Sequence, residues 1–105
     1  MKSLIISFLL VICFSFQSTS PITPDCKCKD ILLKGKVRIV NAFEDFKVRI
    51  VPAFEDIRVD TNGLGQRGCG DWVFVTANED FTIRFVDSFE DFKIRYVAAF
   101  HGLHF

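Results

Sequence analysis

Residues 43–57 read FEDFKVRIVPAFEDI, and their pattern recurs on both sides at a spacing of eleven residues. In each unit, alternating apolar residues lead into a short turn, which ends in Glu-Asp in all units but the last. The block 36–57 also returns as 71–92, thirty-five residues later. Such repeats indicate that one structural unit is used several times. The units are KVRIVNAFEDF (36–46), KVRIVPAFEDI (47–57), DWVFVTANEDF (71–81), TIRFVDSFEDF (82–92) and KIRYVAAFHGL (93–103).

The backbone of these units is predicted to be β-strand. An apolar period of eleven is also compatible with helices in a right-handed supercoil. However, the cores VRIV, VFV, IRFV and IRYV are alternating, β-branched and aromatic, and Pro52 would interrupt a helix. We therefore predict a small all-β domain with strands of about five residues and turns of about six. Units repeated without an Asn-Gly hairpin favour a winding chain over a meander.

Strand alternation assigns the side chains to two faces. The Val, Ile and Phe residues at alternate positions, and Tyr96, are predicted to face the core, and the central arginines are predicted to face solvent. The phenylalanine of each connection is expected to fold back and close the core. The arginines are Arg38, Arg49, Arg84 and Arg95, and the connecting phenylalanines are Phe43, Phe54, Phe89 and Phe100.

Residues 1–20 are predicted to be a signal peptide. Lys2 supplies the positive start, residues 4–16 are apolar, and 18–20 form a small polar end. The apolar run is too short for a comfortable membrane span. We expect a secreted or periplasmic protein with no membrane span in the mature chain. The alternative is an anchor that stays attached and tethers the domain to a membrane.

The remaining chain is divided by composition. A domain of about 85 residues buries only about 60–65% of its unfolded surface and is marginally stable without further support. Two prolines make the first part an extended lead-in, in which Ile31 to Leu33 are expected to add an edge strand. The predicted parts are the signal peptide (1–20), the lead-in (21–35), the repeat domain (36–103) with a central Gly-rich loop (58–70), and a tail (104–105).

Charge excludes one class of partner. Without Lys2, 12 basic and 13 acidic side chains leave a formal charge of −1. No basic stripe of the kind that phosphate backbones require is present, so nucleic acid is not an expected partner. The central loop contains Gly63-x-Gly65-x-x-Gly68, which matches a phosphate-binding pattern. That pattern needs a helix after the glycines, whereas a strand is predicted from Trp72, so the loop is interpreted as a turn.

Three cysteines follow the signal peptide and support export. In an oxidising compartment we expect one disulfide, from Cys26 or Cys28 to Cys69. The third thiol is then free or available to link two chains in a dimer. A zinc site is disfavoured because a Cys-x-Cys pair lacks the usual spacing of zinc ligands.

The repeated Glu-Asp pairs are the main candidates for chemistry, and each begins at Glu44, Glu55, Glu79 or Glu90. Stacked carboxylates could bind Ca²⁺ or act as an acid–base pair. The favoured interpretation is that they form charge ladders with the strand arginines and lysines. Trp72 could belong to a ligand-binding aromatic patch, but a core position is favoured.

The tandem repeats and the break between them resemble those of a known family. The strings DFKVRIVPAFEDIRV and DFTIRFVDSFEDFKIRYVAAF, with a Gly-rich break before Trp72, are similar to the bacterial septoil-knot domain family, whose function is unknown. The similarity covers roughly residues 36–103. It implies a compact β-rich domain whose backbone winds as a seven-crossing torus knot. His101-Gly102 replaces Glu-Asp in the last unit. The resemblance implies no catalytic residues.

Three functions are weighed. The favoured one is an exported non-enzymatic domain, a stable structural or interaction module with a protein or envelope partner and no cofactor or metal. The alternative is a carbohydrate-binding or Ca²⁺-dependent module that uses Trp72 and the Glu-Asp turns. The third, a hydrolase, lacks support because His101 and His104 have no evident nucleophile beside them.

Overall fold

The computed structural model describes residues 20–103 of the 105-residue chain. The predicted signal peptide, apart from Ser20, and the predicted tail at 104–105 lie outside the described residues. The described part contains nine strands and no helix, which confirms the all-β prediction. It therefore also contains no apolar helix long enough to cross a membrane. The strands are β1 (Lys27–Cys28), β2 (Ile31–Leu32), β3 (Gly35–Ile39), β4 (Phe46–Ile50), β5 (Ile57–Val59), β6 (Trp72–Phe74), β7 (Phe81–Phe85), β8 (Phe92–Tyr96) and β9 (Gly102–Leu103).

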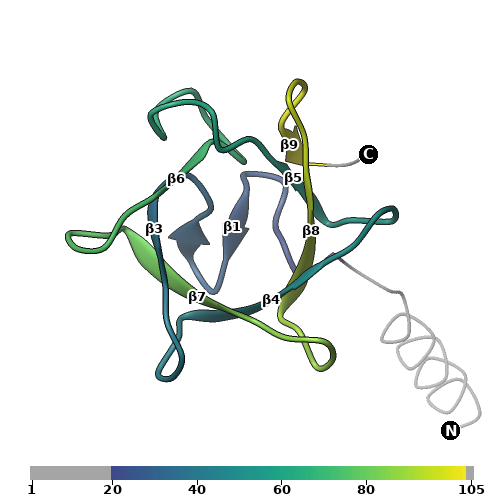
Figure 1. Ribbon diagram of the computed structural model, residues 1–105. Helices are drawn as coiled ribbons and strands as arrows, with labels where there is room; N and C mark the ends of the chain where they lie inside the picture. Colours follow the sequence, from purple (N-terminus) through teal and green to yellow (C-terminus); the bar gives the residue numbers. More distant parts are fainter. Residues whose placement is uncertain (1–19, 104–105) are drawn as a thin grey trace, which may run out of the picture.

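Seven of the strands form one curled sheet in the order β6-β3-β7-β4-β8-β5-β9. All pairings are parallel except that between β5 and β9. The sheet closes on itself because Asp60, just after β5, forms a parallel bridge with Asp71, just before β6. The Trp72 N–H donates to the Asp60 carbonyl at 3.1 Å, and the Asp60 N–H donates to the Gly70 carbonyl at 2.9 Å. The result is the ring of strands seen along its axis in Figure 1.

The two halves of the chain alternate around this ring. Strands β3, β4 and β5 from the first half lie between strands β6, β7 and β8 from the second. Consecutive strands of one half therefore never pair with each other. Each connection between them must pass over one strand of the other half. This arrangement confirms the predicted winding chain and excludes a meander.

Strong stagger accompanies the interleaving. Val48 in β4 lies opposite Phe85, the last residue of β7, and also opposite Phe92, the first residue of β8. Each strand is thus displaced along its neighbour as the ring is followed. The first and third residues of the long strands fill the interior, including Phe46 and Phe81. Edge-to-face contacts join these rings, with centroids 5.6 Å apart.

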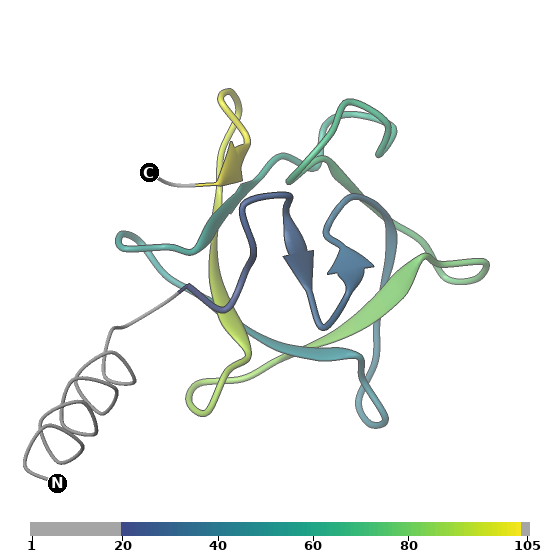
Figure 2. The same ribbon diagram turned by 180° about the vertical axis from the view of Figure 1, so that it is seen from behind.

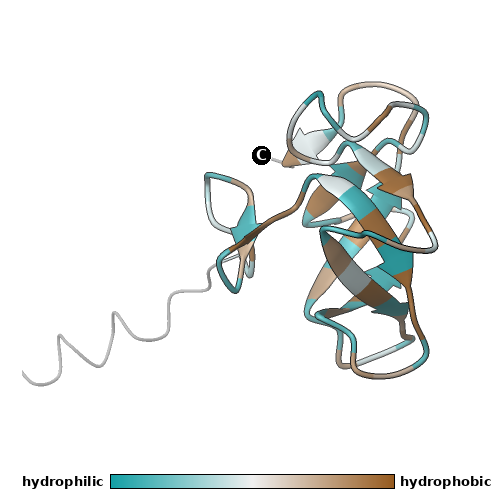
Figure 3. Cartoon of the chain, turned by 90° about the vertical axis from the view of Figure 1, so that its left-hand side faces the viewer, coloured by the Kyte–Doolittle hydropathy of each residue, from teal (hydrophilic) through white to brown (hydrophobic). Residues whose placement is uncertain are grey.

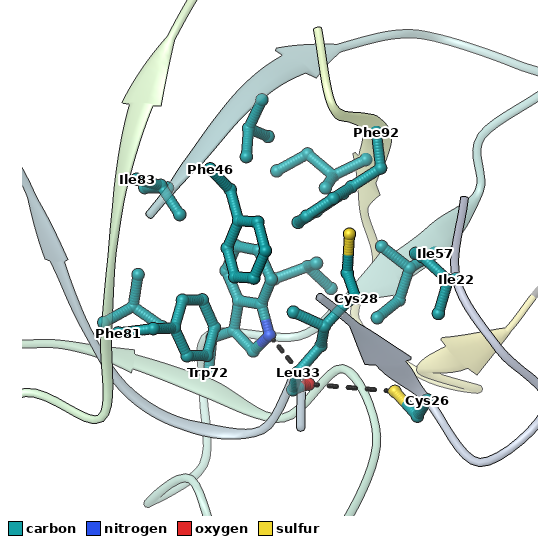
Figure 4. Close-up of a cluster of buried hydrophobic side chains, with 14 residues drawn as sticks. Ile22, Cys26, Cys28, Leu33, Phe46, Ile57, Trp72, Phe81, Ile83 and Phe92 are labelled. Atoms are coloured by element: carbon teal, nitrogen blue, oxygen red, sulfur yellow. Dashed lines mark hydrogen bonds between the residues drawn. The ribbon is translucent and has the colours of Figure 1, made fainter. Parts of the chain in front are cut away.

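The predicted lead-in is more than an extended arm. It contains a separate hairpin of β1 and β2, which covers the end of the barrel where the strands begin (Figures 2 and 3). Its turn residues, Lys29 and Asp30, have φ values of 51° and 65°, as a two-residue hairpin turn requires. Leu33 enters the core, and its carbonyl accepts the Trp72 indole N–H at 3.0 Å (Figure 4).

A disulfide ties this hairpin to the central loop. It joins Cys26 to Cys69, 43 residues apart, in agreement with the predicted pairing of one early cysteine with Cys69. Cys28 is the free thiol and is 5% exposed within the core. A dimer linked through Cys28 would therefore require the hairpin to leave the barrel.

The connecting phenylalanines do not close the core, so that prediction is wrong. Their side chains are 86% to 101% exposed. The loops between the strands radiate from the barrel wall (Figure 1). Each has a φ near +60°, a left-handed conformation that is unusual for phenylalanine. Asn78 occupies the equivalent position of the third unit, with a φ of 61°. The backbone thus turns the phenylalanines outward, where they add nothing to the core.

The alternation prediction holds at the beginning of each strand and fails at its end. The last residues of five strands are 36% to 49% exposed, although alternation placed four of them, all but Phe74, inside. They surround the end of the barrel opposite the hairpin. We call this end the mouth, and it comprises Ile39, Ile50, Phe74, Phe85 and Tyr96.

Loss of the disulfide should destabilise the fold. For the double variant Cys26→Ser/Cys69→Ser, we expect the free energy of unfolding to fall by about 4 kcal/mol, because the unfolded chain regains the freedom of a long loop. Urea denaturation measures the change. Cys28→Ala, which keeps the disulfide, serves as the control and should lose less. Equal losses in both variants would contradict the assigned pairing.

Replacing an exposed left-handed phenylalanine should stabilise the protein. For Phe89→Asn, we expect a gain of about 1 kcal/mol, because asparagine tolerates a positive φ better than phenylalanine. The reverse change, Asn78→Phe, should cost a similar amount. Thermal and urea unfolding of the two variants test this pair. A clear loss of stability in Phe89→Asn would mean that the ring packs against the fold.

Candidate functional site

The repeated glutamates hold the connections onto the barrel. Glu79 accepts two hydrogen bonds from Arg38 on β3, at 2.9 and 3.1 Å, and Glu90 accepts two from Arg49 on β4, at 3.0 and 3.2 Å. In each case the loop carrying the glutamate passes over the strand carrying the arginine. The same rule pairs Glu44 with Arg84 on β7 and Glu55 with Arg95 on β8.

The aspartates that follow bind the backbone of the same crossed strands. Asp80 accepts the Lys36 N–H at 2.8 Å, and Asp91 accepts the Lys47 N–H at 2.7 Å. The equivalent bonds run from Thr82 to Asp45 and from Lys93 to Asp56. We call each such set of bonds a clasp. The four clasps are Glu44-Asp45 on β7, Glu55-Asp56 on β8, Glu79-Asp80 on β3 and Glu90-Asp91 on β4. The glutamate–arginine pairs confirm the predicted charge ladders, whereas the aspartates bind backbone N–H groups of the strands.

The clasp at Glu55 is the most buried. Glu55 is 5% exposed and also pairs with Arg58, at 3.1 Å. Hydrogen bonds from Arg95 lower the pKa of Glu55 from its ordinary 4.5 to about 2, despite the opposing effect of burial. Arginine hydrogen bonds also lower the pKa values of Glu44, Glu79 and Glu90. These carboxylates are therefore held ionised and do not suit proton transfer near neutral pH.

The fifth crossing has no clasp. The connection after β8 passes over β5 and carries His101-Gly102 in place of Glu-Asp. Gly102 instead pairs with Arg58 through the antiparallel strand β9, and the His101 Nδ1 lies 2.7 Å from the Cys69 carbonyl. The substitution noticed in the sequence thus marks a change from side-chain clasp to strand pairing. His104 lies outside the described residues.

The Gly-rich loop wraps a buried carboxylate of its own chain. Asp71 is fully buried and accepts hydrogen bonds from the backbone N–H groups of Gln66 and Arg67, at 3.1 and 2.8 Å. The Arg67 side chain also donates to Asp71 and pairs with Asp60 at 3.3 Å. Hydrogen bonding by Arg67 holds the pKa of Asp71 well below its usual range. The loop amides point at this carboxylate, and strand β6 follows, in agreement with a turn and not a phosphate site.

Glycine is required at one point of this loop. A Cβ on Gly70 would lie 2.2 Å from the Arg58 carbonyl oxygen and 2.8 Å from the Gly102 nitrogen. Three segments of backbone therefore meet here without room for a side chain. The loop positions the closing bridge of the barrel.

Trp72 and the glutamates are not arranged as a ligand site. Trp72 is fully buried, so its ring would have to leave the core to meet a carbohydrate. The oxygens of Glu44, Glu55, Glu79 and Glu90 face arginines, which occupy the positions that a cation would need. Within residues 20–103, no three His, Cys, Asp or Glu side chains form a group suited to a metal.

The structure instead reveals two shallow grooves at the mouth that the sequence did not suggest. One has a volume of about 450 Å³ and is lined by Arg38, Ile39, Phe74, Val75 and Thr76. The other, of about 370 Å³, is lined by Arg49, Ile50, Phe85, Val86 and Asp87. Both grooves are lined by the same positions of the repeat. This equivalence is the sequence feature from which the grooves could have been predicted. They were missed because alternation predicted that Ile39, Ile50 and Phe85 lie inside.

Comparison with known proteins relates the chain to one protein family. The family model of the 7(1) septoil knot domain matches residues 30–104, most of the chain. A comparison with curated proteins gave no match. The matched region includes all seven strands of the barrel, the four clasps and the hairpin strand β2.

Removal of the buried clasp carboxylate should be costly. For Glu55→Gln at pH 7, we expect the free energy of unfolding to fall by about 2 kcal/mol, because two arginines lose a charged acceptor. The wild-type carboxyl has a depressed pKa in the folded state. Its contribution is therefore complete above pH 4.5 and is lost as the pH falls toward 2.

Urea denaturation across this pH range measures both effects. Glu55→Gln should show a weaker decline of stability with acid than the wild type. Glu79→Gln is the matched control: its carboxylate side chain is 24% exposed and it pairs with one arginine, so a smaller loss is expected. If Glu55→Gln and Glu79→Gln lose the same amount, burial does not distinguish the clasps.

Proposed function

Because the chain belongs to the septoil knot domain family, we propose that it is an exported, non-enzymatic module whose useful property is resistance to unfolding. The observation that carries this proposal is the use of the repeated polar side chains. All four Glu-Asp pairs fasten connections to crossed strands. The groups that the sequence marks as candidates for chemistry are thus committed to holding the fold together.

Export is supported by the cysteines and by the sequence at the N-terminus. The Cys26–Cys69 disulfide is compatible with an oxidising compartment, where such bonds persist. Residues 1–20 have the charge and hydropathy pattern of a signal peptide. We propose that the mature protein begins near Pro21 and acts outside the cytoplasm, in the envelope or beyond it.

The carbohydrate-binding and calcium-binding alternatives receive no support from the geometry. Both depend on side chains that have other partners, since Trp72 is in the core and the glutamates bind arginines. A hydrolase is also not favoured, because the ionised clasp carboxylates lack a proton to donate near neutral pH. The proposed role is therefore structural support or attachment of a partner.

The intact mass of the protein recovered from an expressing culture tests export. We expect a chain that begins near Pro21, with one thiol that reacts with a label after denaturation and three that react after reduction. Recovery of the full 105-residue chain with three labelled thiols after residue 20, without reduction, would remove the basis for an extracellular role.

Unfolding kinetics test the proposed resistance. We expect an unfolding rate constant below about 10⁻⁶ s⁻¹ at 25 °C, at the slow limit of small domains. The physical reason is that connections clasped over strands of the other half must be released before the sheet can separate. Denaturant-jump experiments extrapolated to water measure this rate. A value near 10⁻² s⁻¹, which is ordinary for a small domain, would contradict the proposal that resistance to unfolding is the useful property of this module.

A further inference from the structure

The mouth is the one end of the barrel that the described chain leaves uncovered. The hairpin closes the opposite end, where the strands begin (Figures 2 and 3). At the mouth, five large apolar side chains at strand ends are 36% to 49% exposed. Four of them, all but Tyr96, line the two grooves of the repeat. An exposed apolar surface with defined hollows is typical of an interaction site.

The two grooves are built alike. The first takes Arg38 and Ile39 from β3 and Phe74 to Thr76 from the end of β6. The second takes Arg49 and Ile50 from β4 and Phe85 to Asp87 from the end of β7. Each offers an aliphatic and an aromatic side chain as an apolar floor. A branched or linear apolar side chain of a partner would fit each one.

Charge distinguishes the grooves. The arginine of each is neutralised by a bidentate glutamate, Glu79 for Arg38 and Glu90 for Arg49. The first groove then has Thr76 at its edge and no further charged lining residue. The second has Asp87, which is exposed and forms no ion pair with any residue in 20–103. The second groove is therefore net negative, and it complements a cation.

The spacing of the grooves sets the length of the partner. Ile39 lies opposite Ile83, and Ile83 lies opposite Phe46. Ile50 is thus two strands away from Ile39 and four residues further along the barrel wall. At about 4.8 Å per strand and 3.3 Å per residue, the separation is about 14–16 Å, the shorter value being the straight path across the curved wall. Four residues of an extended segment span about 13 Å, close to the shorter value, and side chains four positions apart share one face.

We infer that the mouth binds an extended polypeptide segment that places two apolar side chains, four residues apart, in the two grooves and a basic residue next to Asp87. The inference rests on the proposed function and specifies the partner of that interaction module. Asp87 would repel the anionic headgroups of a membrane and the phosphates of nucleic acid. A polypeptide supplies the apolar pair and the single positive charge together.

Three capped ten-residue peptides provide the probe. Each is serine- and threonine-rich and has two leucines four positions apart. The second residue after the second leucine, which lies on the same face as the leucines, is lysine, glutamine or glutamate. Binding is followed by the NMR methyl signals of Ile39 and Ile50 in the mature, disulfide-bonded protein. We expect both signals to shift and the lysine peptide to bind at least fivefold more tightly than the glutamate peptide.

Matched variants separate charge from fold. Asp87→Asn should remove the preference for lysine, while Thr76→Asn, the same replacement residue in the first groove, should leave it unchanged. Asp87→Lys should reverse the preference toward glutamate. Both positions changed are exposed loop sites, and thermal unfolding checks that each variant is folded.

Several outcomes would overturn the inference. These are no shift of either methyl signal at millimolar peptide, equal binding of all three peptides, or an unaltered preference in Asp87→Asn. Stronger binding to phosphatidylcholine or phosphatidylglycerol vesicles than to any peptide would assign the mouth to a lipid surface and also overturn it. None of these results alters the unfolding rate or the mature mass, so the proposed function stands or falls separately.

Discussion

The clasp between a loop and the strand that it crosses is the interaction on which this fold depends. Neighbouring strands come from different halves of the chain, so every connection within a half must pass over a strand of the other. Such a connection lies outside the sheet and has no neighbouring strand with which its backbone can pair. Glu79 and Asp80 provide the substitute, by binding the Arg38 guanidinium and the Lys36 N–H of the strand below. Charge-assisted hydrogen bonds of this kind are among the strongest that side chains form.

The barrel is asymmetric because its two ends are finished differently. At one end, the hairpin and Leu33 complete the core, and the Cys26–Cys69 disulfide ties the hairpin to the loop that closes the ring. At the other, the strands end in half-exposed apolar side chains with no covering segment among the described residues. Since the parallel strands all run in one direction, equivalent residues of the repeats collect at the same end. The mouth is thus a consequence of repetition combined with parallel pairing.

Repetition also separates what the fold requires from what it does not. The clasp residues are the same in four units, and in each the glutamate binds an arginine and the aspartate a backbone N–H of the crossed strand. The loop tips differ, because Asn78 satisfies a left-handed backbone that Phe89 adopts at a cost. The groove edges differ as well, with Thr76 in one and Asp87 in the other.

The sequence by itself determined the eleven-residue period, the strand identity of the VRIV-type cores, the outward arginines and the pairing of an early cysteine with Cys69. The period, the strands and the outward arginines follow from local propensity and alternation, which depend on residues close in sequence. The cysteine pairing follows from the number of cysteines. The resemblance to the septoil knot family was also readable from the tandem strings, and the family comparison agrees with it.

Only the tertiary structure decided how the units pair and which apolar residues are buried. Strand pairs such as β4 with β8 join residues 44 positions apart, Val48 with Phe92, and no local pattern encodes that choice. Alternation predicts which face of a strand a side chain lies on, but not where along the strand the barrel core ends. Ile39 and Phe85 were therefore assigned to the core, although they lie at the mouth. Phenylalanine carries no signal for a positive φ, which is why the outward loop tips were not foreseen.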